Sequence, residues 1–371
     1  MTVYKSLTAD DKVSTKTLLH EAIPITGTIV SGTYGTFPND NNVQNFAHGM
    51  FQSVYDYPYL SSSANHIFDI SFGTSADAIA VSEQESKKDN IYNQMAQVLM
   101  GYDKDGLIQK FDEDGDLTGG VTINEAIFLP FSRLLVKDEI KKGSFELELG
   151  VNGDYADPMT KRIKIVDQGA ATSYRVNSPA GEYGILYATA SAGTVLDTTS
   201  THTASIGGNT YWRAGLIYYQ AGVAVLTSSV LSATGAIGGN GFLEDLGQTT
   251  LDYDGSGTTF TGSLATQMIS ASADYLRHRI YNLQFNNTIE LNSTVYFCRA
   301  KHNEFNYSSN PTYLSGSQIR VKNETTDIPI SYITSIGLYS ADNQLLAVGK
   351  FSEPIRKDSN IEMTFRARLD Y

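Results

Sequence analysis

The sequence predicts an α+β, mainly β fold, with antiparallel sheets or sandwich-like domains and two or three helices packed on them. The composition is the first observation, because 23 Tyr and 32 Gly stand against 1 Trp and 9 Pro. Tyr, Thr and Val favour strands, while Gly and Asn favour the turns between them. The second observation is the number of short segments in which apolar and polar residues alternate. The third is that helical spacing of apolar residues is found in three segments.

Strands are predicted where alternation places apolar side chains on one face. In Ser144–Val151, three apolar residues alternate with Glu146 and Glu148, so one face should be buried. The last strand, Ile361–Asp370, has the most regular alternation in the chain and should be half buried. The other predicted strands are Ile23–Ile29, His66–Phe72, Phe128–Val136, Arg162–Val166 and Thr294–Cys298.

Two hairpins are predicted. Leu216–Tyr219 and Val223–Leu226 flank a short Gln-Ala-Gly sequence, which is typical of a hairpin turn. Gly337–Lys350 reads as a strand, a short polar turn and a second strand. Helices are predicted at Val43–Tyr55, Ser86–Met100 and Ser263–Tyr281, where apolar residues recur every three or four positions.

The length and composition predict three segments. Residues 1–169 are expected to form an N-terminal α+β domain. Residues 170–262, rich in Ser, Thr and Gly, are expected to form a β insertion and linker. Residues 263–371 are expected to form a C-terminal helix and β-hairpin region that can pair with the N-terminal domain.

The charge and the single cysteine exclude several classes of protein. The formal net charge is −13, which disfavours direct binding to nucleic acid. No apolar run approaches about 20 residues, so no membrane span is expected. Cys298 is the one cysteine, so it forms no intramolecular disulfide and is expected to be a buried apolar residue.

The acidic sequence Asp112-Glu113-Asp114-Gly115-Asp116 resembles the start of a calcium loop, with oxygen ligands at the first, third and fifth positions. Leu117 and Ile123 then stand where an EF-hand has Gly and Glu. We therefore expect a solvated acidic turn, no metal and no cofactor.

No catalytic residue is predicted either. The chain contains no nucleophile elbow, phosphate-binding loop or dinucleotide fingerprint. Acid pairs such as Asp252 with Asp254, or Glu244 with Asp245, could in principle serve a carbohydrate-active enzyme. We expect these acids to be solvated, and the protein not to be an enzyme.

Tyr55, Tyr57 and Tyr59 are the candidate site residues. They occupy alternate positions before and after Pro58 and would share one face of an extended segment. Two interpretations stand: the rings pack in the core, or they form a subunit interface, where Tyr is enriched.

Four segments carry a resemblance to a known group of proteins: Val54–Ile70, Ile91–Leu99, Ile140–Leu147 and Ile333–Pro354. Together they resemble virion structural proteins of contractile-tailed phages (myoviruses), especially those that infect marine cyanobacteria. The resemblance implies a place in the virion, assembled in the host cytoplasm, and implies no catalytic residues.

The expected function is therefore a non-enzymatic component of the tail, baseplate or neck, working through subunit interfaces. Its expected partners are other virion proteins and further copies of the same chain. The alternative is a tail-fibre or adhesion module, in which loops between residues 170 and 262 bind a glycan of the host surface.

Overall fold

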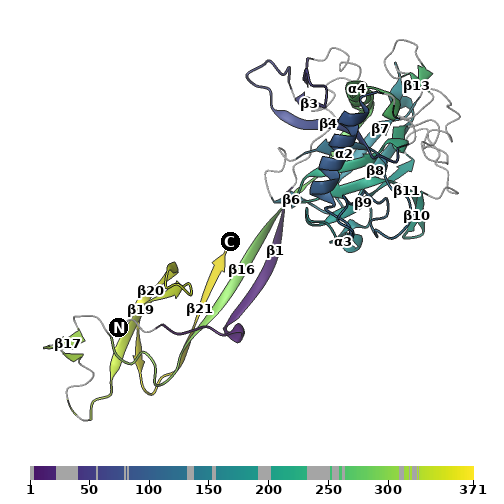
Figure 1. Cartoon of the computed structure of the whole chain (residues 1–371). Coiled ribbons are helices and arrows are strands. Elements are labelled where there is room, and N and C mark those ends of the chain that lie inside the picture. The colour runs from purple at the N-terminus through teal and green to yellow at the C-terminus, as the bar shows by residue number, and fades with distance from the viewer. Residues whose placement is uncertain are drawn as a thin grey trace. The chain divides into compact units, whose positions relative to one another are not determined.

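The computed structural model contains two compact units. Unit 1 consists of Met1–Leu19 and Glu290–Tyr371, and unit 2 consists of His20–Ile289. Within the described residues the chain is mainly β, with several antiparallel sheets and three α-helices, which confirms the predicted fold class (Figure 1). The structure describes residues 4–21, 41–55, 57–78, 81, 83–131, 138–152, 156–190, 202–231, 251–252, 259–260, 264–308, 313–316, 318–319, 324 and 326–371.

Unit 2 is built on one antiparallel sheet, to which eleven of the described strands belong. Its strand order is β15 (Ile280–Gln284), β7 (Glu146–Gly150), β8 (Arg162–Val166), β9 (Tyr183–Ala190), β11 (Asn209–Tyr218), β12 (Val223–Thr227), β5 (Glu125–Pro130), β4 (His66–Thr74), β3 (Phe51–Tyr55) and β2 (Val43–Asn45), and β10 (Thr203–Ile206) pairs with β11.

Most predicted strands of unit 2 are confirmed. The predicted hairpin is formed by β11 and β12, with Tyr218 opposite Val223. The strands predicted around residues 66–72, 144–151 and 162–166 correspond to β4, β7 and β8. The strand predicted at Phe128–Val136 is β5, which begins earlier, and residues 132–137 lie outside the described part. Ile23–Ile29 also lies outside the described residues.

Two of the three predicted helices are present. Helix α2 (Glu85–Leu99) matches the helix predicted at Ser86–Met100 closely, and α4 (Ile269–Arg279) forms the central part of the helix predicted at Ser263–Tyr281. The backbone of α2 closely approaches β4 at Gly73, where an added Cβ would lie 2.8 Å from the backbone nitrogen of Tyr92. Only glycine leaves room for this contact. The third helix, α3 (Ala170–Ser173), has one turn.

The helix predicted at Val43–Tyr55 is wrong. This segment forms β2 and β3, joined by a turn in which the Gly49 N–H donates to the Phe46 carbonyl at 2.9 Å. Gly49 has φ +64°, which ends any regular helix there. The apolar residues lie at helical spacing, but pairing of β3 with β4 and packing against α4 determine the structure.

The two units do not follow the three segments predicted from composition. Strands from all three segments belong to the sheet of unit 2, because β8 pairs with β9 across the boundary at 169/170, and β15 pairs with β7. The latter pairing agrees with the expectation that residues 263–371 can pair with the N-terminal region. Large parts of 170–262, including 191–201 and 232–250, lie outside the described residues.

Unit 1 is built from long antiparallel strands. Strand β16 (Asn287–Ala300) lies between β1 (Lys12–Glu21) and β21 (Met363–Asp370). The first residues of β16, Asn287 and Thr288, belong to unit 2 and pair there with β6 (Glu139–Ile140). Strands β19 (Ile330–Tyr339) and β20 (Leu345–Asp358) form a separate two-stranded sheet, which confirms the second predicted hairpin. The remaining short elements are η1 (Ala9–Asp11), η4 (Pro158–Thr160), η5 (Ser228–Leu231), η7 (Leu264–Thr266), β13 (Leu251–Asp252), β14 (Thr259–Phe260), β17 (Leu314–Ser315) and β18 (Gln318–Ile319).

The predicted last strand is confirmed as β21. Exposure alternates along its whole length, with the apolar residues half buried and the polar residues exposed. Ile361 precedes the strand and is not part of it. Among the described helices, none is long and apolar enough to cross a membrane.

Candidate functional site

The three tyrosines do not share a face of one strand. Strand β3 ends at Tyr55, and the chain then turns, with the Ser61 N–H donating to the Pro58 carbonyl at 2.8 Å. The Tyr55 hydroxyl donates to Gln44 Oε1 at 2.9 Å, and its ring centroid lies 6.4 Å from that of Tyr59.

Tyr57 and Tyr59 are not core residues of this chain. Tyr57 is 57% exposed and Tyr59 is 37% exposed, and the adjacent Leu60 is 85% exposed. The turn therefore presents two aromatic rings and one aliphatic side chain to solvent. An exposed aromatic cluster of this kind suits a protein contact, so the three tyrosines remain candidates for an interface.

A second exposed apolar surface lies on the β19–β20 hairpin, and we call it the hairpin face. In the pairing register Gly337 lies opposite Val348, and Tyr339 lies opposite Leu345, so these residues share one side. Leu346 is an extra residue between two paired positions, at a bulge. The hairpin face comprises Tyr339, Leu345, Leu346 and Val348, which are 42%, 54%, 68% and 59% exposed.

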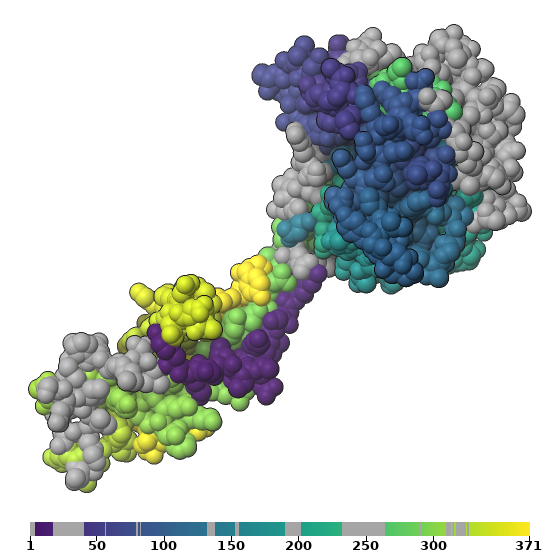
Figure 2. Space-filling model, in the orientation of Figure 1, coloured from purple at the N-terminus to yellow at the C-terminus, as the bar shows by residue number. Residues whose placement is uncertain are grey.

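The hairpin face is ordered by its own contacts. The Tyr339 ring folds over Gly337, where an added Cβ would lie 2.8 Å from a carbon of that ring. Tyr4 meets the Tyr339 ring edge-on, with the ring centroids 4.8 Å apart. Figure 2 shows the yellow residues of β20 open to view, uncovered by other segments on this side.

Unit 1 has very little core of its own. Among its described residues, the buried apolar side chains are Val295 and Ala300. Phe351 and Phe365, whose ring centroids are 4.9 Å apart, are each only half buried. A fully buried side chain of medium size contributes about 1.5–3 kcal/mol, and each ordered residue costs about 1–2 kcal/mol of entropy. The apolar side chains fully buried among the described residues of unit 1 therefore offset only a small part of the entropy cost of ordering it.

The sequence predicted the hairpin but not its exposed face. Leu345, Leu346 and Val348 look like ordinary strand residues, and alternation alone does not reveal whether another layer covers them. The available signal was the pair of adjacent leucines directly after a polar turn, since in a regular strand one of the two would face solvent and a bulge is needed to place both on one side.

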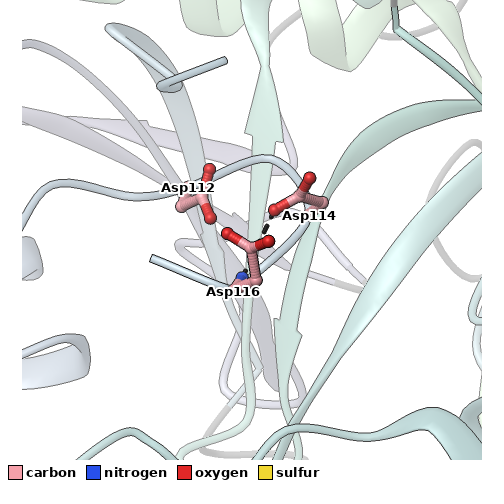
Figure 3. A group of neighbouring side chains, drawn as sticks. All are labelled: Asp112, Asp114 and Asp116. Carbon is pink, nitrogen blue, oxygen red and sulfur yellow. Dashed lines mark hydrogen bonds between the residues drawn. The ribbon is translucent and has the colours of Figure 1, made fainter. Parts of the chain in front are cut away.

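The acidic sequence at 112–116 is not a simple solvated turn, contrary to our expectation. It begins a loop whose ends pair, with the Ile123 N–H donating to the Phe111 carbonyl at 2.9 Å. Asp112 is only 5% exposed, whereas Asp116 is exposed. Figure 3 shows the side chains of Asp112, Asp114 and Asp116 gathered together, and one carboxylate oxygen from each lies within 4.8 Å of the others.

The pKa values of Asp112 and Asp114 in this loop shift in opposite directions. Burial raises the pKa of Asp112, and the neighbouring carboxylates of Asp114 and Asp116 raise it further. Burial also acts to raise the pKa of Asp114, but its interactions with Asp112, the Asp116 N–H group and Arg213 outweigh burial and lower it. Arg213 lies 3.9 Å from Asp114.

The remaining acid of the loop has a dedicated partner. Glu113 is 2% exposed, and its carboxylate lies 2.9 Å from His202 Nδ1. Burial raises the pKa of Glu113, while the hydrogen bond with Glu113 raises the pKa of His202. The His202 ring stacks on Trp212 with ring centroids 5.8 Å apart. This pair is a buried structural contact.

The acid pairs considered for a carbohydrate-active enzyme give no assembled site. Glu244, Asp245 and Asp254 lie outside the described residues, and Asp252 belongs to the short strand β13.

Comparisons with protein-family models, with curated proteins and with solved structures found no match for this chain. The exposed apolar surfaces and the acidic loop are therefore the features of the described residues that bear on function.

Proposed function

We propose that the chain is a non-enzymatic structural component of a contractile-tailed phage virion, in the tail, baseplate or neck. It acts through subunit interfaces, and the hairpin face of unit 1 is the principal contact surface. The observation that carries this proposal is that unit 1 exposes ordered apolar residues while its described residues bury two apolar side chains.

The β19–β20 hairpin is a two-stranded sheet. A two-stranded sheet is marginally stable in water when nothing covers it. Here both strands are long, yet nearly every described residue of β20 is exposed or half buried. Contiguous exposed apolar residues on an ordered element are typical of a surface that another protein covers. Covering the hairpin face would supply the burial that unit 1 lacks.

A second copy of the chain is the occupant that fits best. Unit 1 carries 12 Lys and Arg against 11 Asp and Glu, whereas the whole chain carries 27 against 40. The negative charge is thus concentrated in unit 2, and unit 1 is almost neutral. Near-neutral surfaces associate with copies of themselves more readily than strongly charged ones, because like charges do not repel. Unit 1 therefore suits contact between copies.

The assignment to a virion depends on the four segments that resemble myovirus structural proteins. One of them, Ile333–Pro354, contains most of β19 and β20 and includes the whole hairpin face. The resemblance and the exposed surface thus involve the same residues. Tyr57 and Tyr59 supply a second candidate contact, on unit 2.

The test is to locate the chain in a cryo-EM map of a whole phage particle. The proposal expects continuous density for unit 1, with the hairpin face covered by a neighbouring subunit. A particle in which this chain is missing, or in which the hairpin face is bare, would contradict the proposal. Specific binding on a glycan array by an otherwise monomeric chain would favour the adhesion alternative, and turnover of a polysaccharide would favour an enzyme.

A further inference from the structure

We propose that the loop from Phe111 to Ile123 binds a calcium ion through the carboxylates of Asp112, Asp114 and Asp116. This site uses none of the residues of the proposed assembly surfaces and does not depend on the proposed virion role.

One carboxylate oxygen of Asp112 is buried and unsatisfied in the part of the chain that the structure describes. Asp112 is only 5% exposed, and its Oδ2 accepts a hydrogen bond from the Leu117 N–H at 2.9 Å. Its Oδ1 is buried and has no hydrogen-bond partner among the described residues. A buried carboxylate oxygen without a donor or counter-ion is costly. A bound cation would remove that cost.

This oxygen points into the acidic cluster. Asp112 Oδ1 and Asp114 Oδ2 each lie 3.6 Å from the position that a Cβ on Gly120 would occupy. Gly120 has φ +78° and no side chain, so the space between the two oxygens stays free. The three carboxylates come from one loop and gather on one side of it (Figure 3).

The spacing of the oxygens suits calcium. Calcium takes six to eight oxygen ligands at about 2.3–2.6 Å, so ligands on opposite sides of the ion are about 5 Å apart. The carboxylate oxygens lie within 4.8 Å of one another, so all three can contact one ion. Magnesium keeps several waters and takes one or two protein carboxylates, so a cluster of three favours calcium.

The mismatch at the sixth position is less serious than the sequence suggests. An EF-hand has Gly there, because the sharp turn requires it. Leu117 stands in its place and adopts φ +60°, the left-handed conformation that glycine supplies more easily. The turn is therefore formed despite the leucine. Ile123 at the twelfth position still supplies no carboxylate, so we expect weak binding, at the affinity of extracellular calcium modules.

The loop is already held in place by protein contacts. Arg175 donates to the Asp114 carbonyl at 3.0 Å. The Tyr183 hydroxyl and the Asn177 amide each donate to the Gly115 carbonyl at 3.2 Å. These contacts fix the backbone, so little ordering is required when an ion binds.

The described positively charged groups near the loop do not pair with the Asp112 Oδ1 oxygen. Arg213 is 3.9 Å from Asp114, too far for a direct hydrogen bond, and His202 is paired with Glu113. The Arg175 guanidinium donates a hydrogen bond to the backbone carbonyl of Asp114. None of these contacts satisfies Asp112 Oδ1.

The experiment measures the thermal midpoint of the full chain, first stripped with EDTA and then with millimolar calcium or magnesium. We expect calcium to raise the midpoint by several degrees and magnesium to have a smaller effect. Terbium should bind at the same place and luminesce on excitation of Tyr183, whose hydroxyl contacts the loop. No calcium shift in the wild-type chain would overturn the proposal.

The Asp112→Asn variant tests whether Asp112 binds the calcium ion or has only a structural role. It removes a buried charge, so without calcium the variant should be at least as stable as the wild-type chain. It should lose the calcium shift and the terbium signal, so the order of stability reverses when calcium is added. Asp116→Asn, at an exposed position, should weaken calcium binding severalfold without affecting folding.

The matched control is Asp105→Asn, in a further Asp-x-Asp-Gly sequence at 103–106, where Asp105 is exposed beside Lys104. This variant should keep the full calcium shift. An equal shift in Asp112→Asn, Asp105→Asn and the wild-type chain would show that calcium binds elsewhere and would overturn the proposal.

Discussion

Tyr57→Ala tests whether the exposed tyrosine turn belongs to an interface. Tyr57 is 57% exposed in the single chain, so less than half of its side chain is buried there. Complete burial of a large side chain contributes about 1.5–3 kcal/mol, so truncation should cost the isolated chain about 1 kcal/mol. That corresponds to a fall of about 2–4 °C in thermal midpoint for a unit of this size.

The effect on assembly should be larger. Truncation of an interface anchor costs about 2 kcal/mol or more, which weakens association by about 30-fold. The assay compares the thermal midpoint of the isolated chain with its incorporation into particles. Tyr102→Ala is the matched control, since Tyr102 is 59% exposed on the same unit. A large loss of monomer stability with normal incorporation, or equal incorporation defects in both variants, would refute the interface interpretation.

Two further predictions concern Gly73 and Asp167 of unit 2, the first with a control variant in unit 1. Gly73→Ala should destabilise the chain by about 3 kcal/mol in denaturant unfolding, because the new Cβ would lie 2.8 Å from the Tyr92 backbone nitrogen. The control Gly349→Ala, whose Cβ would have nothing within 4 Å, should stay within about 0.5 kcal/mol of the wild-type chain. Equal effects of the two variants would contradict the packing of α2 on β4. Burial raises the pKa of Asp167 from 3.8 to about 6 despite hydrogen bonds from Gly143, Phe145 and Tyr219. Because the folded-state pKa is the higher one, its stabilising contribution is complete below pH 3.8 and is lost as the pH rises through about 6, a change of about 3 kcal/mol. Relative to Asp167→Asn, which does not titrate, the wild-type chain should therefore lose stability between pH 4 and pH 7; a difference that does not change with pH would contradict the raised pKa.

Local patterns predicted much of the fold. Alternation and turn residues were enough to predict β8, β21 and the β11–β12 hairpin. These are local patterns, and their meaning does not depend on residues far along the chain. Val43–Tyr55 was misread because strand pairing with residues far along the chain overrides its helical spacing. The predicted segments differ from the two units for the same reason: composition changes at 170 and 262, but the sheet of unit 2 contains strands from both sides of each position.

The candidate sites were less predictable. A calcium-loop pattern was visible from Asp112 to Asp116, but the sequence could not show that Leu117 adopts a positive φ or that Asp112 is buried. Exposure of Tyr57 depends on the end of β3 at Tyr55, which no local pattern indicates. Whether Val348 faces solvent depends on the absence of a covering layer in the described chain, and that is a property of the tertiary structure.

The most direct test of the account is the mass of the full-length chain in solution, measured by light scattering over a range of concentrations. The wild-type chain should form a defined oligomer. Val348→Glu, at a 59% exposed position of the hairpin face, should shift it towards the monomer. Val98→Glu, at a 67% exposed position of α2, should leave the oligomer unchanged. A wild-type chain that stays monomeric at every concentration, or an oligomer that Val348→Glu leaves intact, would contradict assembly through the hairpin face.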